Sequence, residues 1–256
     1  MADAFVWGLR RMWRKFRAGL GVALFLAVAG VWLCIPRGLR WRRCLAVMAW
    51  RCLLPAFGIR VEVHGTPLPE AGTLYVANHV SWTDIPVLGL VLNAGFVAKG
   101  DIRGWPVIGK LTEAYGCLFV ERERRGKAQD QAAALASHLE AERGLVLFPE
   151  GTTGLGLETL PFRSSLFALV PGVADGSAKV QPVTLRYLRA DGAPLTEAEQ
   201  RQIAWIGDDE LLPHAGGLLK GPRLVAQVWF EQPVLAADRK ALARACEAAV
   251  AERLKA

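Results

Sequence analysis

From Ile59 to the C-terminus, short apolar runs alternate with longer segments of helical character. The runs that read as strands are Arg60–Val63, Thr73–Ala77, Phe96–Ala98, Cys117–Val120, Leu145–Phe148, Val180–Leu185 and Leu224–Phe230. The segments that read as helices are Asp84–Leu92, Trp105–Ala114, Lys127–Glu142, Ser165–Val170 and Ala237–Lys255. This alternation predicts an α/β fold with a mixed, largely parallel sheet flanked by helices. Asp191–Gly217, which has Pro and Gly and mixed polarity, is expected to be an excursion on the surface.

The N-terminal segment has a different character. Ala18 to Ile35 is an uncharged apolar run of eighteen residues, and a second apolar stretch, Trp41 to Phe57, follows a turn at Pro36–Gly38. Eighteen residues is the lower limit for a membrane-spanning helix, so two interpretations stay open: a spanning helix, or a helical hairpin embedded in one leaflet. We therefore divide the chain into an N-terminal membrane-anchoring helical segment, 1–58, which we expect to form a hydrophobic helical hairpin, and a second domain, 59–256.

The charge distribution agrees with a membrane partner. Residues 1–60 carry a net charge of +10 and the remainder carries −3, within a total of +7. Arginines that flank an apolar run favour an anionic membrane surface, and no nucleic-acid-binding motif is present, so nucleic acid is not an expected partner. The five cysteines have no disulfide or metal-site spacing, which indicates reduced thiols on the cytoplasmic side and predicts no metal site.

The strongest chemical signal is Asn78-His79-Val80-Ser81-Trp82-Thr83-Asp84, in which four residues separate His79 from Asp84. Two side chains at this spacing do not share a helical face. The expected geometry is a strand end, a turn carrying His79, and a helix that Asp84 opens, with Ser81 or Thr83 as its cap. A carboxylate that holds one imidazole nitrogen leaves the other free to act as a general base. By itself, this spacing is more often a turn histidine beside a helix-start carboxylate.

Two further segments place polar residues at the end of a predicted strand. Gly116-Cys117-Leu118-Phe119-Val120-Glu121-Arg122 ends in an arginine, which suits a phosphate but also fits a solvated charge cluster. Phe148-Pro149-Glu150-Gly151-Thr152-Thr153 supplies a carboxylate that either accepts hydrogen bonds from a polyol or holds the loop.

Taken together and in this order, these segments resemble the glycerolipid acyltransferases, specifically the 1-acylglycerol-3-phosphate acyltransferases, over about residues 59–235. The resemblance implies that His79 is the general base and Asp84 its orienting partner. It also implies a fatty acyl transfer from acyl-CoA or acyl carrier protein to the free hydroxyl of 1-acylglycerol-3-phosphate, without a cofactor, giving phosphatidic acid. The substrate-binding residues that it implies are Asn78, Lys99, Arg122, Glu150, Gly151, Thr152 and Arg163. We expect the protein at a bacterial-type inner membrane, with its catalytic domain facing the cytoplasm.

One departure from the family pattern concerns the acceptor. Many members carry an arginine after Glu-Gly-Thr, whereas this chain has Thr153. In this respect it resembles a branch that includes lyso-ornithine-lipid acyltransferases, whose acceptor has no phosphate; Arg163 is a candidate to replace the missing charge. A lyso-ornithine lipid, or another lysolipid, is therefore the alternative acceptor.

Three other functions compete with an acyltransferase. Gly104–Lys110 matches the first seven positions of a nucleotide-binding P-loop, but Leu111 stands where Ser or Thr is required. A serine hydrolase is disfavoured because the chain has no Gly-x-Ser-x-Gly motif. A non-catalytic membrane-binding protein remains a third possibility, against which the intact His79 and Asp84 argue.

Overall fold

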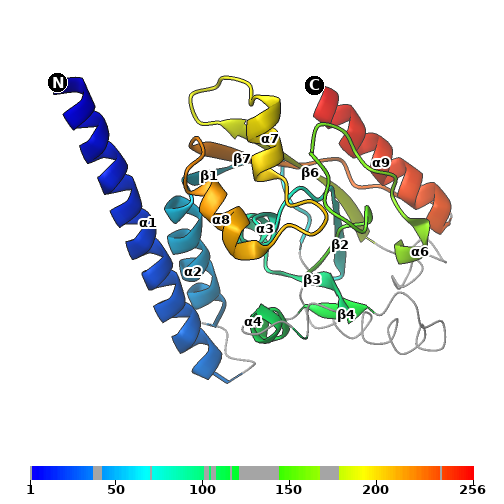
Figure 1. Ribbon diagram of the computed structural model, residues 1–256. Coiled ribbons are helices and arrows are strands. Elements are labelled where there is room, and N and C mark those ends of the chain that lie inside the picture. The colour runs from blue at the N-terminus through cyan, green and yellow to red at the C-terminus, as the bar shows by residue number, and fades with distance from the viewer. Residues whose placement is uncertain are drawn as a thin grey trace.

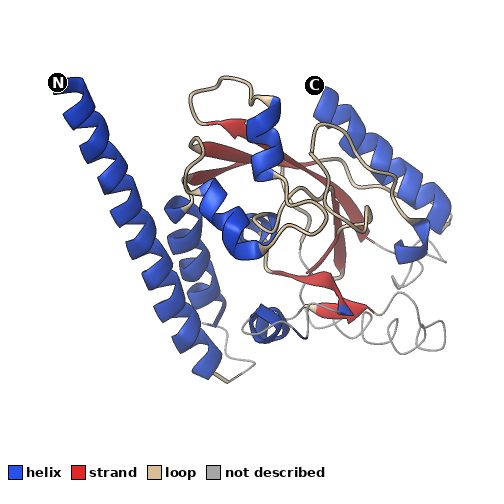
Figure 2. Ribbon diagram, viewed as in Figure 1, coloured by secondary structure: helices blue, strands red, loops and turns tan. Residues whose placement is uncertain are grey.

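The computed structural model describes residues 2–36, 42–69, 71–100, 104, 108–115, 117–120, 144–167, 179–236 and 238–256. Within these residues, seven strands form one sheet in the order β1-β7-β6-β2-β5-β3-β4. The strands are β1 (Ile59–His64), β2 (Thr73–Ala77), β3 (Ala94–Lys99), β4 (Leu118–Val120), β5 (Gly144–Leu147), β6 (Lys179–Arg189) and β7 (Leu224–Phe230). Only β6 and β7 pair antiparallel. The predicted mixed, largely parallel sheet flanked by helices is confirmed (Figure 2).

The helices are α1 (Ala2–Cys34), α2 (Arg42–Ala56), α3 (Asp84–Val91), α4 (Ile108–Tyr115), α6 (Ser164–Phe167), α7 (Glu197–Ile203), α8 (Leu211–Leu218) and α9 (Arg239–Lys255). In Figure 1, α9 covers one face of the sheet, while α2, α3 and α8 lie over the other. The helix expected over Lys127–Glu142 lies outside the described residues.

The central strands are buried on both faces, which explains their continuous apolar sequence. In β2, Leu74 and Val76 belong to the core under α6 and α9, whereas Tyr75 and Ala77 belong to the core under α2 and α3. This division follows from the alternation of side chains along a strand. Because β2, β5 and β3 run parallel, their carboxyl ends meet at one edge of the sheet, where the Asn78–Asp84 and Phe148–Thr153 segments begin.

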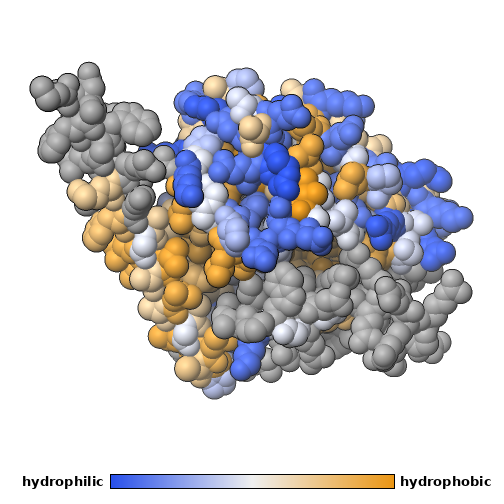
Figure 3. Space-filling model, viewed as in Figure 1, coloured by the Kyte–Doolittle hydropathy of each residue, from blue (hydrophilic) through white to orange (hydrophobic). Residues whose placement is uncertain are grey.

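The N-terminal helices form the expected hairpin. Gly21 permits the close approach of α1 to α2, since a Cβ at this position would lie 2.7 Å from the Cβ of Ala56. The segment Phe16–Cys34 is the one helix among the described residues that is long and apolar enough to cross a membrane, and 17% of it is buried. Large apolar side chains are exposed along the hairpin at Met12, Phe16, Leu20, Leu24, Leu26, Val31, Leu33 and Met48. In Figure 3, hydrophobic residues gather over the hairpin formed by α1 and α2.

The surface excursion expected over Asp191–Gly217 also has helices and buried residues that the sequence did not indicate. It contains α7 and most of α8, and it contributes the buried residues Ile203 and Ala204 to the core. A capping box at the start of α7, in which Thr196 and Glu199 bond each other's backbone N–H, carried the sequence signal. The end of α7 also reaches the candidate site, because Trp205 N donates to Val80 O at 3.0 Å.

Candidate active site

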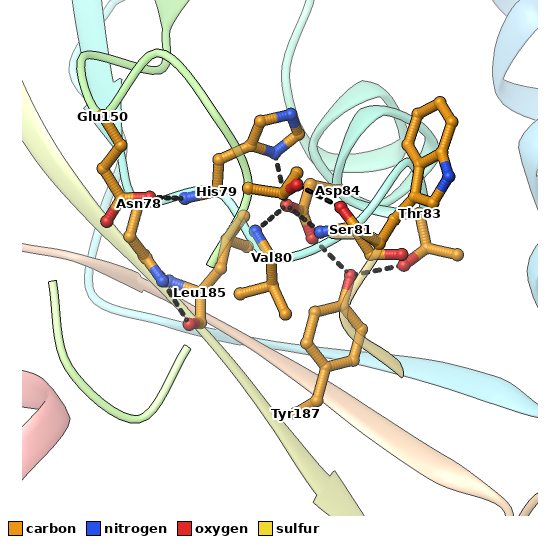
Figure 4. Close-up of polar contacts among 11 residues, drawn as sticks. Asn78, His79, Val80, Ser81, Thr83, Asp84, Glu150, Leu185 and Tyr187 are labelled. Carbon is orange, nitrogen blue, oxygen red and sulfur yellow. Dashed lines mark hydrogen bonds and ion pairs between the residues drawn. The ribbon is translucent and has the colours of Figure 1, made fainter. Parts of the chain in front are cut away.

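His79 and Asp84 lie in direct contact at the carboxyl edge of the sheet (Figure 4). His79 Nδ1 is 2.7 Å from Asp84 Oδ2, and the His79 side chain is 20% exposed while Asp84 is fully buried. A carboxylate only accepts hydrogen bonds, so Nδ1 carries the proton and donates it. His79 Nε2 is therefore the nitrogen that is left to accept a proton from a substrate.

Three donors besides His79 hold the Asp84 carboxylate. Asp84 Oδ2 also accepts from Val80 N at 2.7 Å and from Ser81 N at 3.0 Å. Its second oxygen, Oδ1, accepts from Tyr187 Oη at 2.7 Å. Since the backbone donors are part of the same turn that carries His79, the turn itself sets the distance between the base and its carboxylate. Neither Ser81 nor Thr83 caps α3 with its side chain, contrary to expectation; the Thr83 hydroxyl contacts Tyr187 Oη at 2.8 Å instead.

Tyr187 is the residue of this site that the sequence did not indicate. It lies on β6, 103 residues from Asp84, and burial raises its pKa well above the ordinary value, with a further contribution from the Asp84 charge. Tyr187 therefore stays protonated and acts as a permanent donor to Asp84. No local motif marks it, because its position beside Asp84 depends on the pairing of β6 with β2.

We expect Tyr187→Phe to lower kcat by about tenfold with little change in KM, because Asp84 loses one charge-assisted hydrogen bond but keeps its other donors. Steady-state kinetics and thermal unfolding should be measured together. Loss of thermal stability with an unchanged kcat would contradict a positioning role and leave only a structural one.

Glu150 lies beside His79 but is turned toward the backbone. Its Oε2 accepts from His79 N at 2.9 Å, its Oε1 accepts from Leu160 N at 3.1 Å, and the residue is 3% exposed. Of the two roles considered for this carboxylate, the geometry favours holding the loop. Glu150 thereby joins the strand-end turn of β2 to the loop after β5.

Burial raises the pKa of Glu150 to about 7, although the two backbone donors favour the charged form. Because the folded protein then binds this proton more tightly than the unfolded chain, stability falls as pH rises from the unfolded value of 4.5 through about 7. The full effect is about 3 kcal/mol. We expect the melting temperature to fall between about pH 5 and pH 8, and Glu150→Gln to remove this component.

Circular dichroism melts across this range would test the effect, with Glu158→Gln, an exposed glutamate of the same loop, as the matched control. Equal pH slopes in the wild type and in Glu150→Gln would contradict it.

Asn78 is also buried beside His79. Its Oδ1 accepts from Leu185 N at 2.8 Å and its Nδ2 donates to Leu185 O at 3.0 Å. The side chain thus takes the place of a strand neighbour for β6, and it fixes the point at which the turn leaves β2. As a substrate contact, Asn78 stays a prediction.

The other residues implied by the resemblance are distributed around this edge. Gly151 has a φ of 75°, the left-handed conformation that glycine adopts most readily, and Thr152 is exposed. Lys99 ends β3, where its backbone is paired with Val120 of β4. The Arg163 side chain is exposed, and Arg163 N donates to Pro149 O at 2.9 Å. Arg122 lies outside the described residues.

Two aromatic rings form the wall behind the imidazole. The ring of Phe148 stacks on His79 with centroids 4.0 Å apart, and Phe96 stacks in turn on Phe148 at 6.2 Å. One face of the imidazole is thereby shielded from water while the ring keeps an exposed edge. A shielded, oriented imidazole with one free nitrogen can deprotonate an alcohol.

Comparisons with known proteins agree with this chemistry. An acyltransferase family model matches residues 60–186. Lyso-ornithine lipid O-acyltransferase of Brucella abortus is 38% identical over 216 residues, which is 81% of this chain and 80% of the relative. A 1-acyl-sn-glycerol-3-phosphate acyltransferase of Neisseria meningitidis is 39% identical over 144 residues, which is 56% of this chain and 55% of the relative.

The fold also has a solved counterpart. The crystal structure of a 1-acyl-sn-glycerophosphate acyltransferase from Thermotoga maritima superposes with a TM-score of 0.60 and 20% sequence identity, covering 94% of this chain and 96% of the other. At this identity the likeness describes the fold alone. It extends over the N-terminal helices as well as the sheet.

Proposed function

Because this chain belongs to the glycerolipid acyltransferase family, we propose that this lysolipid acyltransferase transfers a fatty acyl group from an acyl thioester to the free hydroxyl of a lyso-ornithine lipid. The observation that carries the choice of acceptor is Thr153. This residue stands where many phosphate-acceptor enzymes have arginine, and its hydroxyl donates to the backbone oxygen of Trp205. The position that carries arginine in many phosphate-acceptor enzymes is thus occupied by a neutral side chain whose hydroxyl is hydrogen-bonded to the backbone.

The relatives support the same acceptor. The match to the Brucella enzyme extends over four fifths of both chains, whereas the match to the Neisseria enzyme extends over little more than half. The sequence alone favoured 1-acylglycerol-3-phosphate, and these matches support the alternative better. An ornithine head group has a carboxylate in place of a phosphate, and the exposed Arg163 near the Glu150 loop is a suitable partner for it.

The proposed reaction needs no covalent enzyme intermediate. His79 Nε2 removes the proton of the lysolipid hydroxyl as its oxygen attacks the thioester carbonyl, and the Asp84 carboxylate stabilises the imidazolium that forms. The tetrahedral intermediate then expels the thiolate of coenzyme A or acyl carrier protein, which takes the proton back from His79. A new ester C–O bond replaces the C–S bond. Holding both substrates beside the imidazole supplies much of the acceleration.

The N-terminal hairpin is the proposed anchor, 1–58, of the acyltransferase domain, 59–256. Its exposed apolar side chains and basic charge suit the inner-membrane surface of a bacterial cell, with the domain on the cytoplasmic side. Both substrates carry fatty chains, so an enzyme held at this surface meets the lysolipid within its own membrane.

An acyl-transfer assay tests the proposal. The full-length protein in membranes is offered lyso-ornithine lipid and 1-acylglycerol-3-phosphate side by side, each with acyl-CoA and with acyl carrier protein donors. We expect a higher kcat/KM for lyso-ornithine lipid. A preference for 1-acylglycerol-3-phosphate would overturn the proposed acceptor and favour the second candidate, for which Arg122 is the residue that the resemblance offers.

We expect Thr153→Arg to shift the acceptor preference by about tenfold toward 1-acylglycerol-3-phosphate, because it restores a phosphate ligand at this position. The matched control is Thr153→Val, which removes the hydrogen bond to Trp205 without adding charge. The measured quantity is the ratio of kcat/KM for the two acceptors. An equal shift in both variants would contradict the assignment of acceptor selectivity to charge at this position.

A further inference from the structure

A second lipid-binding feature lies away from the His79 site, where the hairpin meets the sheet. The middle of α1, the end of α2, and the starts of β1 and β7 enclose a cavity of about 850 Å³. We call it the basic groove. Its apolar floor includes Val22, Leu54, Phe57, Ile59 and Leu224. In Figure 1, α1 extends beyond the C-terminal end of α2. The groove lies beside this end of α2, on the side of the molecule that carries the hairpin.

The opening of the groove is strongly basic. Arg17, Arg51, Arg60 and Arg223 are exposed and line it, and its lining includes no Asp or Glu among the described residues. Arg60 is paired with Glu62 at 2.6 Å. Within the part of the chain that the structure describes, no ion pair reaches the other three arginines. Three guanidinium groups therefore surround an apolar floor without a carboxylate from the described chain to neutralise them.

The basic groove is separate from the acyl-transfer site. None of the residues that hold or shield His79 lines it. Leu185 of β6 bonds Asn78 at the site, whereas Ala190, the first residue after β6, lines the groove. A separation of five residues along an extended strand corresponds to roughly 17 Å. An acyl chain lying against the groove floor is therefore not in the position of a reacting substrate.

The chemistry of the groove matches one kind of molecule. Guanidinium groups bind phosphate with paired, charge-assisted hydrogen bonds, and an apolar floor binds hydrocarbon. The volume lies within the 300–1,000 Å³ typical of ligand pockets, and one side of the groove is a helix with exposed apolar side chains. We propose that the basic groove holds one anionic phospholipid of the surrounding membrane, with its phosphate among Arg17, Arg51 and Arg223 and an acyl chain on the apolar floor.

The test counts bound lipid. Full-length protein in a non-ionic detergent is titrated with phosphatidylglycerol, and bound lipid per chain is measured by native mass spectrometry. We expect saturation at one lipid per chain, with phosphatidylcholine binding about tenfold more weakly or worse because its head group has no net charge. Millimolar inorganic phosphate should not displace the lipid, since it cannot use the floor.

Two variants separate the groove from general attraction to the membrane. Arg51→Gln with Arg223→Gln should weaken binding by about tenfold, whereas Arg43→Gln with Arg244→Gln, at exposed positions outside the groove, should not. Gly19→Trp should abolish the bound lipid without changing charge, because Gly19 lines the groove and a Cβ there meets no atom within 4 Å. Gly30→Trp, equally open on the same helix but outside the groove, is its control.

Loss of the bound lipid in Gly19→Trp alone would support the proposal. Equal binding of phosphatidylcholine, displacement by inorganic phosphate, or wild-type lipid binding in Gly19→Trp would each overturn it.

Discussion

His79→Ala is expected to lower the rate of acyl transfer by about 10³-fold, because general-base catalysis contributes roughly 10² to 10⁴ and no neighbouring group among the described residues can replace the free Nε2. Asp84 is fully buried behind the imidazole, and both oxygens of Glu150 are bonded to backbone N–H groups. The measurement is the initial rate of product formation on membranes, with acceptor and donor both saturating. Membrane binding should be unchanged, since His79 lies in the second domain.

His64→Ala is the matched control. His64 ends β1, the edge strand at the opposite end of the strand order from β4, and its ring stacks on Trp229 with centroids 3.8 Å apart. Its loss should leave the rate within about threefold of the wild type, as for most substitutions away from a catalytic group. If His79→Ala kept most of the activity, the base assignment would fail. If neither the wild type nor the variant transferred an acyl group while both bound membranes, the non-catalytic alternative would gain support.

Asp84→Asn should lower kcat by about 10³-fold, within an order of magnitude of the loss seen when the aspartate of a Ser-His-Asp triad becomes asparagine. The amide has the shape of the carboxylate and can keep an oxygen toward Val80 N and Ser81 N. The substitution removes the negative charge that stabilises the imidazolium during proton transfer. The expected result is therefore a loss in kcat from a protein that still folds.

Circular dichroism and the kcat–pH profile complete this test. Asp209→Asn removes a partly exposed carboxylate that pairs with Arg201 at 2.9 Å, and it serves as a charge-matched control with near-normal activity. A kcat for Asp84→Asn within about tenfold of the wild type would show that hydrogen bonding alone, without charge, suffices to orient His79.

Most of the fold could be predicted from the sequence because its signals are local. Six of the seven strands were expected within two residues of their observed bounds, and the central ones are apolar throughout because they are buried on both faces. The exception is β6, which was expected to end at Leu185 and continues to Arg189. The helices α7 and α8 were missed because they are short and their region contains Pro and Gly, and because the Thr196–Glu199 capping box was not recognised. The antiparallel direction of β7 could not be predicted, since the strand pattern is the same in either direction.

The candidate site also has features that could be predicted from local sequence and features that could not. The relation of His79 to Asp84 lies within one turn, so the sequence contained both partners and their spacing. Tyr187 and the loop-holding role of Glu150 could not be seen, because both depend on contacts between segments that are far apart in the chain. Nothing near Tyr187 in the sequence distinguishes it from an ordinary strand tyrosine.

The amino-acid sequence by itself determined the alternation of strands and helices, the apolar basic N-terminus, and the pairing of a histidine with a nearby carboxylate. These properties depend on local periodicity, on charge and on spacing within one turn. Only the tertiary structure decided the strand order, the burial of Glu150 and Asn78, the Tyr187 donor, and the meeting of four arginines around an apolar groove. Those features require residues that are separated by tens to hundreds of positions to come together. Burial of the central strands, through the hydrophobic effect, supplies the free energy that brings them together.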